Sequence, residues 1–163
     1  MTVGPVNWSV RTSLRVLKVD DLERNFMKSP KFNNEGVDEL TFAPFVLVNA
    51  LDTEYRDVRL SFSDWKWLHE KHGQGQSIGD QYIGDYYLNG YGIEALVKSL
   101  LFKNGFDVES DDLEFDSEGD TCYIHFKNLE KAVTAAELAS AMISDLHEME
   151  QMIQVARDEG FDD

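Results

Sequence analysis

The stretch from Leu113 to Phe126, LEFDSEGDTCYIHF, decides the fold, because polar and apolar side chains alternate on both sides of a turn. Alternation with a period of two is typical of strands that bury one side. We expect strands over Leu113–Asp116 and Thr121–Phe126, joined by the turn Ser117-Glu118-Gly119-Asp120. In this turn Gly119 is expected to supply the positive φ that such turns often need.

The alternation also divides the hairpin into two sides. The side expected to face the core consists of Leu113, Phe115, Cys122, Ile124 and Phe126. The side expected to face water consists of Glu114, Asp116, Tyr123 and His125. The hairpin is therefore predicted to be fastened to the core through one side and to present carboxylates with two ring side chains on the other.

Strand patterns dominate the first half of the chain. Residues 8–17 alternate as a half-buried strand, and a short helical turn is expected at residues 22–26. A further strand over residues 40–48 is expected to be interrupted at Pro44, at an edge or a bulge, and another covers residues 58–62.

Helix patterns dominate the second half. A short helix carrying Trp65, Leu68 and His72 is predicted after the caps Ser63 and Asp64. Longer helices are expected after Asn89, ending at Asn104-Gly105, and after Asn128, with Ser144 either kinking the latter or capping another that ends at Gly160. The order of elements predicts an α+β fold with a mainly antiparallel sheet and a helical C-terminal region, in a single domain over residues 1–163.

The composition restricts the partners. The 163 residues carry 31 Asp and Glu against 15 Lys and Arg, a formal charge of -16, which repels nucleic acid and anionic lipid. A basic protein partner is expected instead. The single Cys122 excludes an intramolecular disulfide, and the first residues lack a signal-peptide pattern, so we expect a soluble cytoplasmic protein.

Half of the excess negative charge lies in one segment. Between Asn104 and Phe126 there is no Lys or Arg, and the eight carboxylates are Asp107, Glu109, Asp111, Asp112, Glu114, Asp116, Glu118 and Asp120. An EF-hand loop with Gly119 at its sixth position has His125 where a bidentate Glu is required. Catalytic carboxylates need a partly desolvated cleft, whereas strand alternation turns these residues toward water. A plain solvated surface remains an open reading.

Other constellations give weaker signals. His69 and His72 are spaced for a shared metal, with Glu70 or Asp64 as the only further ligands, but a surface helix explains them equally well. The loop Gly73 to Gly79 lacks the Lys of a P-loop. Cys122 alternates onto the apolar side, as a buried structural thiol would. We therefore expect no enzyme activity, no cofactor and no metal.

The C-terminal half resembles a family of bacterial polymorphic-toxin immunity proteins, immunity family fifty-one. The resemblance rests on Asn89-Gly90-Tyr91 opening a helix, on Leu113-Glu114-Phe115-Asp116-Ser117-Glu118 opening a hairpin, and on the two-part helical tail from Asn128 to Asp158. It covers roughly residues 82–158. Such proteins bind the C-terminal domain of a cognate toxin and block its active site or substrate path.

The resemblance implies a non-catalytic inhibitor, and the charge independently favours a basic target such as a nuclease, with an RNase preferred. The expected contact face is Glu114, Asp116, Glu118, Asp120, Tyr123 and His125, with Asp107, Glu109, Asp111 and Asp112 at its rim. Trp65, Trp67 and the loop Gly73 to Gly79 are the next candidates. The alternative is an acidic adaptor or nucleic-acid mimic that binds a basic host protein, and a homodimer through the C-terminal helix stays open.

Overall fold

The computed structural model describes residues 28–73 and 81–163. The strand predicted at residues 8–17, the helical turn at residues 22–26 and all but the first residue of the glycine loop lie outside the described residues. None of the helices in the described ranges has the length and apolar character needed to cross a membrane.

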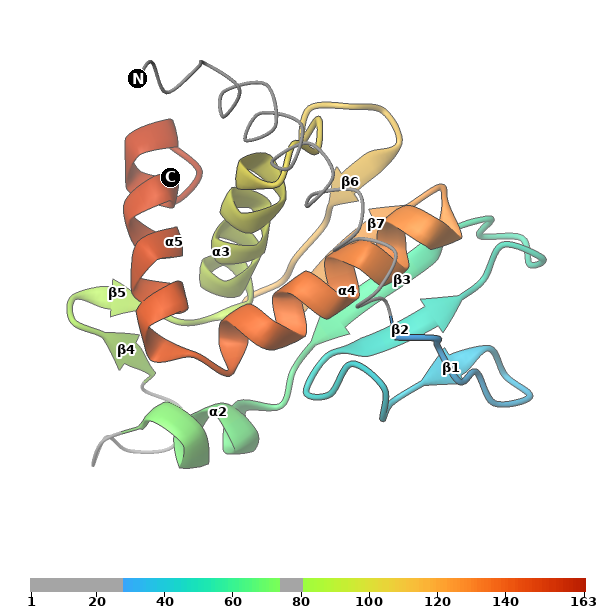
Figure 1. The fold of residues 1–163 in the computed structure, drawn as a ribbon, viewed down its shortest axis with the longest axis horizontal. Coiled ribbons are helices and arrows are strands. Elements are labelled where there is room, and N and C mark those ends of the chain that lie inside the picture. Colours follow the sequence, from blue (N-terminus) through green and yellow to red (C-terminus); the bar gives the residue numbers. More distant parts are fainter. Residues whose placement is uncertain (1–27, 74–80) are drawn as a thin grey trace, which may run out of the picture.

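A five-stranded antiparallel sheet forms the centre of the fold (Figure 1), in the order β1-β2-β3-β7-β6. Its strands are β1 (Val37–Asp38), β2 (Val46–Asn49), β3 (Val58–Phe62), β6 (Leu113–Phe115) and β7 (Cys122–Phe126). The hairpin quoted above thus supplies the outermost strand β6 and its neighbour β7. A separate two-stranded hairpin consists of β4 (Tyr82–Ile83) and β5 (Tyr86–Tyr87).

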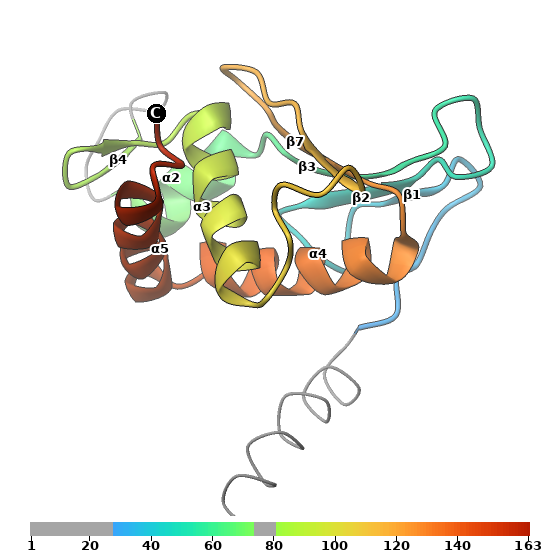
Figure 2. The same cartoon turned by 90° about the horizontal axis from the view of Figure 1, so that it is seen from above.

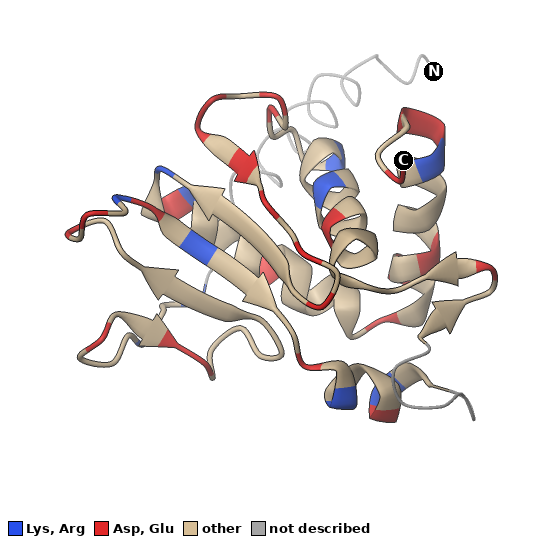
Figure 3. Cartoon of the chain, turned by 180° about the vertical axis from the view of Figure 1, so that it is seen from behind, with Lys and Arg blue, Asp and Glu red and all other residues tan. Residues whose placement is uncertain are grey.

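The longer helices lie on one side of this sheet (Figure 2). Helix α4 (Leu129–Ile143) crosses the sheet, while α3 (Gly90–Lys103) packs beside β7 and against α5 (Leu146–Glu159). Helix α2 (Trp65–His72) follows β3. No helix of the described part covers the opposite side of the sheet, which we call the open sheet face (Figure 3). The predicted α+β class and helical C-terminal region are confirmed.

The core lies between the sheet and α4. Leu60 and Ile124 are paired on the central strands and are fully buried. Helix α4 meets them with a row of small buried side chains, Ala132, Ala135, Ala136 and Ala139. Small residues let the helix backbone approach the sheet closely, which leaves few voids. The predicted inner side of the hairpin is confirmed, with the β7 members fully buried and the edge members Leu113 and Phe115 half-buried.

Side-chain caps fix where the helices begin. The side chains of Asn89, Asn128 and Asp64 accept the N–H groups three residues on, at 2.8, 2.9 and 3.0 Å, as predicted. Each cap satisfies one of the N–H groups that a helix start leaves without a partner. Between α4 and α5 the cap of the second helix is Asp145, whereas Ser144 ends the first, so these are two separate helices.

Two local predictions are wrong, and the strands of two residues were not predicted. Residues 41–44 form turns, and the strand expected over residues 40–48 is confined to β2, because Pro44 has no N–H to donate to a sheet. The short strands β1, β4 and β5 span two residues each and give no periodic signal. Gly119 does not have a positive φ. The six residues between β6 and β7 form a wide loop rather than a tight turn, so Gly119 does not need a positive φ.

This wide loop, residues 116–121, is drawn onto the N-terminus of α3. The N–H of Gly90 donates to the carbonyl of Gly119 at 3.0 Å, and the Ser117 N–H donates to the Glu94 carboxylate at 3.0 Å. The indole N–H of Trp65 donates to the Asp120 carbonyl at 2.7 Å. The backbone of the loop can approach the backbone of α3 this closely only because Gly90 has no side chain. A Cβ at that position would lie 1.8 Å from the Glu118 carbonyl oxygen.

We predict that Gly90→Ala lowers the free energy of unfolding by about 3 kcal/mol or more, because the Cβ has backbone rather than a flexible side chain in its way. Urea unfolding followed by circular dichroism measures the loss. Gly119→Ala is the matched control in the same loop, since a Cβ there meets nothing within 4 Å. Equal stability of the two variants would contradict the close approach.

A buried carboxylate holds the far edge of the sheet. Asp38 of β1 is 1% exposed, and its oxygens accept the N–H groups of Lys31, Leu40 and Thr41 at 2.6, 3.1 and 2.9 Å. Burial by itself raises the pKa of Asp38, but these donors and the Thr41 side chain outweigh it and hold the pKa below its ordinary value. The Asp38 carboxylate thus accepts N–H groups of the chain around β1 that are not paired with a neighbouring strand.

The lowered pKa gives a pH prediction. A carboxyl whose pKa is lower in the folded state stabilises the fold above its unfolded pKa, and this contribution is lost as the pH falls through the folded value. We expect Asp38→Asn to lower the free energy of unfolding at pH 7 by about 1–3 kcal/mol, and by less at pH 3. Urea unfolding at both pH values measures this, with the exposed Asp52→Asn as control. A loss that is the same at both pH values would contradict the assignment.

Candidate functional site

All eight carboxylates of the acidic segment, residues 107–120, are exposed. Figure 3 shows acidic residues following this segment from the loop before β6, along β6, and into the loop that contacts α3. The segment therefore marks one edge of the sheet with negative charge. Because Glu118 and Asp120 lie in the loop that contacts the N-terminus of α3, the positive end of that helix dipole stabilises part of this charge locally.

Little else in the described residues neutralises the segment. Glu109 forms an ion pair with Lys98 of α3 at 3.4 Å, and the Lys98 ammonium also lies over the rings of Phe115 and Phe161. Asp107 and Asp120 accept local hydrogen bonds. Within residues 28–73 and 81–163 no ion pair or hydrogen bond engages the remaining carboxylates, Asp111, Asp112, Glu114, Asp116 and Glu118.

The ten predicted contact residues do not form one flat face. Glu114 and His125 are register partners on β6 and β7 and, with Tyr123, lie on the open sheet face, as predicted. Asp107 and Asp112 instead line a pocket on the helix side of the sheet. The acidic segment therefore wraps the β6 edge, so that carboxylates are presented on both sides of it.

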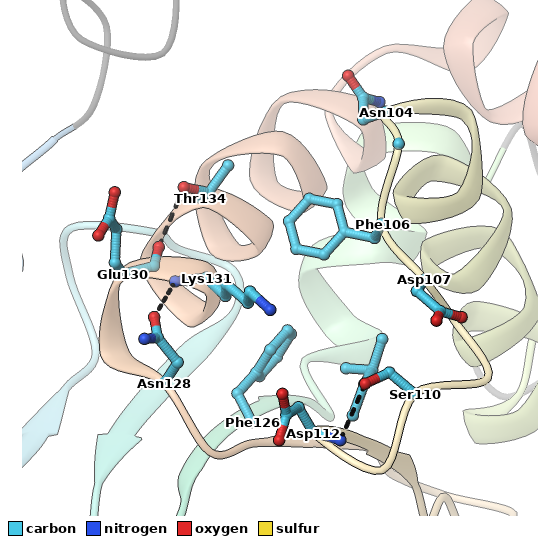
Figure 4. A pocket seen from close by; sticks show the side chains of 12 residues that line it. Asn104, Phe106, Asp107, Ser110, Asp112, Phe126, Asn128, Glu130, Lys131 and Thr134 are labelled. Carbon is cyan, nitrogen blue, oxygen red and sulfur yellow. Dashed lines mark hydrogen bonds between the residues drawn. The ribbon is translucent and has the colours of Figure 1, made fainter.

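The pocket behind the edge has a volume of about 520 Å³ and lies between the end of α3 and the start of α4. Phe106 and Phe126 supply apolar walls, and Lys131 extends between their rings (Figure 4). Asp107 and Asp112 lie across from the start of α4, and no ion pair joins either to Lys131 in the described structure. The pocket lining thus combines two aromatic rings with the carboxylates of Asp107, Asp112 and Glu130 and the ammonium of Lys131.

The structure adds a charged cluster that the sequence did not predict. On the open sheet face His125 is paired in register with Arg59 of β3, and its Nδ1 lies 2.6 Å from Asp57 Oδ2. Arg59 Nη2 lies 3.4 Å from the same oxygen, with its guanidinium 5.7 Å from the centre of the Tyr55 ring. Residue alternation predicted that His125 lies on this face. No pattern in the sequence predicts that β3 is the neighbour of β7, so the contacts with Asp57 and Arg59 were not predicted.

The hydrogen on His125 can be assigned from these distances. The Nδ1 atom lies 2.6 Å from the Asp57 carboxylate and 3.5 Å from Arg59 Nε, and it cannot donate to the first while accepting from the second. The shorter contact, to a carboxylate, decides in favour of Nδ1 as the donor. His125 is thereby fixed in orientation, with Nε2 as the second polar atom of its ring.

His69 and His72 have structural partners. His72 Nε2 donates to the Ile143 carbonyl at 2.7 Å, which joins α2 to the end of α4. The Gln81 amide donates to His69 Nδ1 at 2.9 Å. Within the described ranges no three His, Cys, Asp or Glu side chains are grouped so as to hold a metal ion. The spacing of His69 and His72 thus reflects the attachment of α2 to the rest of the fold.

Cys122 is fully buried on the inner side of β7, and burial raises the pKa of its thiol to about 12. A thiol of this kind holds almost no thiolate at neutral pH and is therefore a poor nucleophile. The prediction of a buried structural thiol is confirmed.

We expect native Cys122 to react with a disulfide reagent such as DTNB at pH 8 at least about 100-fold more slowly than the urea-unfolded chain, because both burial and the raised pKa suppress the thiolate. The absorbance of the released reagent thiolate follows the reaction. We expect one thiol per chain to react when the protein is unfolded. Equal rates for native and unfolded protein would show that β7 opens readily and would contradict the described core.

Comparison of the chain with protein-family models, with curated proteins and with solved structures finds no match. The resemblance of residues 82–158 to immunity proteins therefore stays a prediction. The residues on which this resemblance rests also have structural roles in the fold. Asn89 caps α3, Gly90 lets the hairpin loop touch that helix, and the stretch from Leu113 to Glu118 forms the edge strand and its loop.

Proposed function

We propose that this protein is a cytoplasmic, non-catalytic immunity protein that binds a basic toxin domain, with a nuclease as the preferred target, and blocks its active site or substrate path. The observation that carries the proposal is the exposed acidic edge, eight carboxylates with a single cation paired to them in the described structure. The resemblance of residues 82–158 to immunity proteins supports the class of partner. The open sheet face beside this edge supplies the area for contact.

Electrostatics explain why such an edge suits an inhibitor. A nuclease must carry positive charge around its nucleic acid site, so an unneutralised row of carboxylates is attracted to that site over a long range. Complementary charge raises the association rate more than it raises the affinity. An inhibitor that must act before its target reaches nucleic acid benefits from fast association.

The anchored loop supports the same role. Residues 116–121 are held by Gly90, Glu94 and Trp65, so Glu118 and Asp120 are displayed on a backbone with fixed geometry. Pre-organised contacts lose less conformational freedom on binding. Tyr123 and the fixed ring of His125 lie next to the carboxylates and provide the kind of side chains that interface centres favour.

The proposal is tested by co-expression with the product of the gene immediately upstream, which we expect to be a toxin that this protein neutralises. In a purified pair we expect the triple variant Asp116→Lys, Glu118→Lys and Asp120→Lys to associate at least tenfold more slowly at low salt, with a weaker dependence on salt. Stopped-flow fluorescence measures both effects.

The matched control reverses three other exposed carboxylates that have no ion pair or side-chain hydrogen bond in the described structure, Glu35→Lys, Glu150→Lys and Glu159→Lys. It makes the same change in net charge away from the acidic edge. Equal slowing by both triple variants would contradict a local contact face. Continued toxicity in the presence of soluble protein would contradict the immunity role, and capture of a housekeeping nucleic-acid enzyme instead would favour the acidic adaptor.

A further inference from the structure

A second surface lies at the start of α3 and precedes the acidic segment in the sequence. Tyr82 and Tyr87 are register partners in the β4–β5 hairpin, with ring centres 5.1 Å apart, and Tyr91 in the first turn of α3 is 56% exposed. Exposed tyrosines combine a large apolar ring with a polar tip, and they are enriched where proteins bind each other. We call these three residues the tyrosine cluster.

The tyrosine cluster borders a pocket of about 500 Å³. Tyr87 and Tyr91 contribute to its wall, together with the end of α5 and the residues that follow it. Its carboxylates are Asp85, Glu94, Asp162 and Asp163, and the one basic residue of its lining is Arg157. A pocket with aromatic walls and four carboxylates has the composition expected of a site for a cationic side chain.

The contacts of Arg157 show which groups of this pocket bind a guanidinium. Its Nη2 lies 2.9 Å from Asp85 Oδ1, its Nε lies 3.9 Å from Asp162, and its guanidinium carbon lies 5.8 Å from the centre of the Tyr86 ring. The pKa of Asp85 is lowered by this contact. Arg157 thus takes two of the four carboxylates and one ring face, and one oxygen of Glu94 accepts the Ser117 N–H. Tyr87, Tyr91, Asp163 and the second oxygen of Glu94 complete this part of the lining.

We propose that this pocket binds an arginine side chain of a protein partner, stacked on the rings of Tyr87 and Tyr91 and paired with Asp163 and the second oxygen of Glu94. The planar guanidinium favours this over lysine, because it can stack on a ring and pair with a carboxylate at the same time. The inference rests on the proposed function for the identity of the partner, the basic toxin domain, but not for the arginine chemistry.

The charge argues against a second copy of this chain as the occupant. Each copy carries a formal charge of -16, and the pocket lining is acidic, so two copies repel one another as they approach. A basic partner removes that repulsion. Concentration-dependent self-association lost in Tyr91→Ala would overturn the choice of occupant.

Binding can be tested with a defined probe. We expect N-acetyl-arginine amide to produce saturable shifts of the Tyr87, Tyr91 and Glu94 amide signals in a two-dimensional NMR titration. N-acetyl-citrulline amide has nearly the same shape without the charge, and it should produce no saturable shift. N-acetyl-lysine amide should bind at least threefold more weakly than the arginine probe.

Variants locate the site. Tyr91→Ala should weaken arginine binding roughly threefold or more, Tyr91→Phe should preserve it because the ring remains, and Tyr55→Ala should leave it unchanged. Tyr55 is a matched exposed tyrosine, 67% exposed, in the loop before β3. Equal shifts with citrulline, or shifts that grow without saturation at every carboxylate, would overturn the proposal.

The partner is tested separately. With the purified upstream-encoded protein, Tyr91→Ala should speed dissociation at least threefold, whereas the reversal of Asp116, Glu118 and Asp120 acts mainly on association. Unchanged dissociation in Tyr91→Ala, alongside a normal charge-reversal effect, would overturn the assignment of this pocket to the toxin and leave the proposed function intact. Faster dissociation in Tyr91→Ala, with no effect of reversing Asp116, Glu118 and Asp120, would overturn the acidic contact face and leave the assignment of this pocket intact.

Discussion

The structure depends on one contact between backbones, the docking of the loop between β6 and β7 on the N-terminus of α3. Gly90 permits the approach, and its N–H reaches the carbonyl of Gly119. Glu94 and Trp65 hold the loop on either side. The contact joins the edge of the sheet to the helix that packs against α5, and it fixes the position of the acidic loop. Fold and candidate site therefore share the same few residues.

The same contact reconciles the charge of the segment with its stability. Like charges along one strand repel, yet the backbone of the loop that carries Glu118 and Asp120 contacts the positive end of α3, and Lys98 of the same helix pairs with Glu109. The fold stabilises part of the charge and leaves the carboxylates of Glu114 and Asp116 exposed, with no ion pair to either from residues 28–73 or 81–163. Such an edge keeps its attraction for a basic surface. The tyrosine cluster lies beside the start of the same helix, so both proposed contact surfaces adjoin α3.

Sequence periodicity predicted the elements that have a clear pattern. Alternation in β3 and β7 and the caps Asn89 and Asn128 gave the strands and helices, and they placed Glu114 and His125 on one side. It did not predict which strands are neighbours, so Asp57 and Arg59 beside His125 were missed. Strands of two residues carry no period, and for that reason the β4–β5 hairpin, with its tyrosines, was also missed. Long-range packing decides these features, and local patterns do not encode it.

The central claim is that the anchored hairpin forms the contact face for a basic protein. Hydrogen exchange measured by mass spectrometry, with and without the purified upstream-encoded protein, tests it most directly. The amides of Gly90 and Ser117 should already exchange slowly in the free protein, and the peptide covering residues 113–126 should gain further protection in the complex. Protection confined to α4 or to the loop before β3, with residues 113–126 unchanged, would contradict the account.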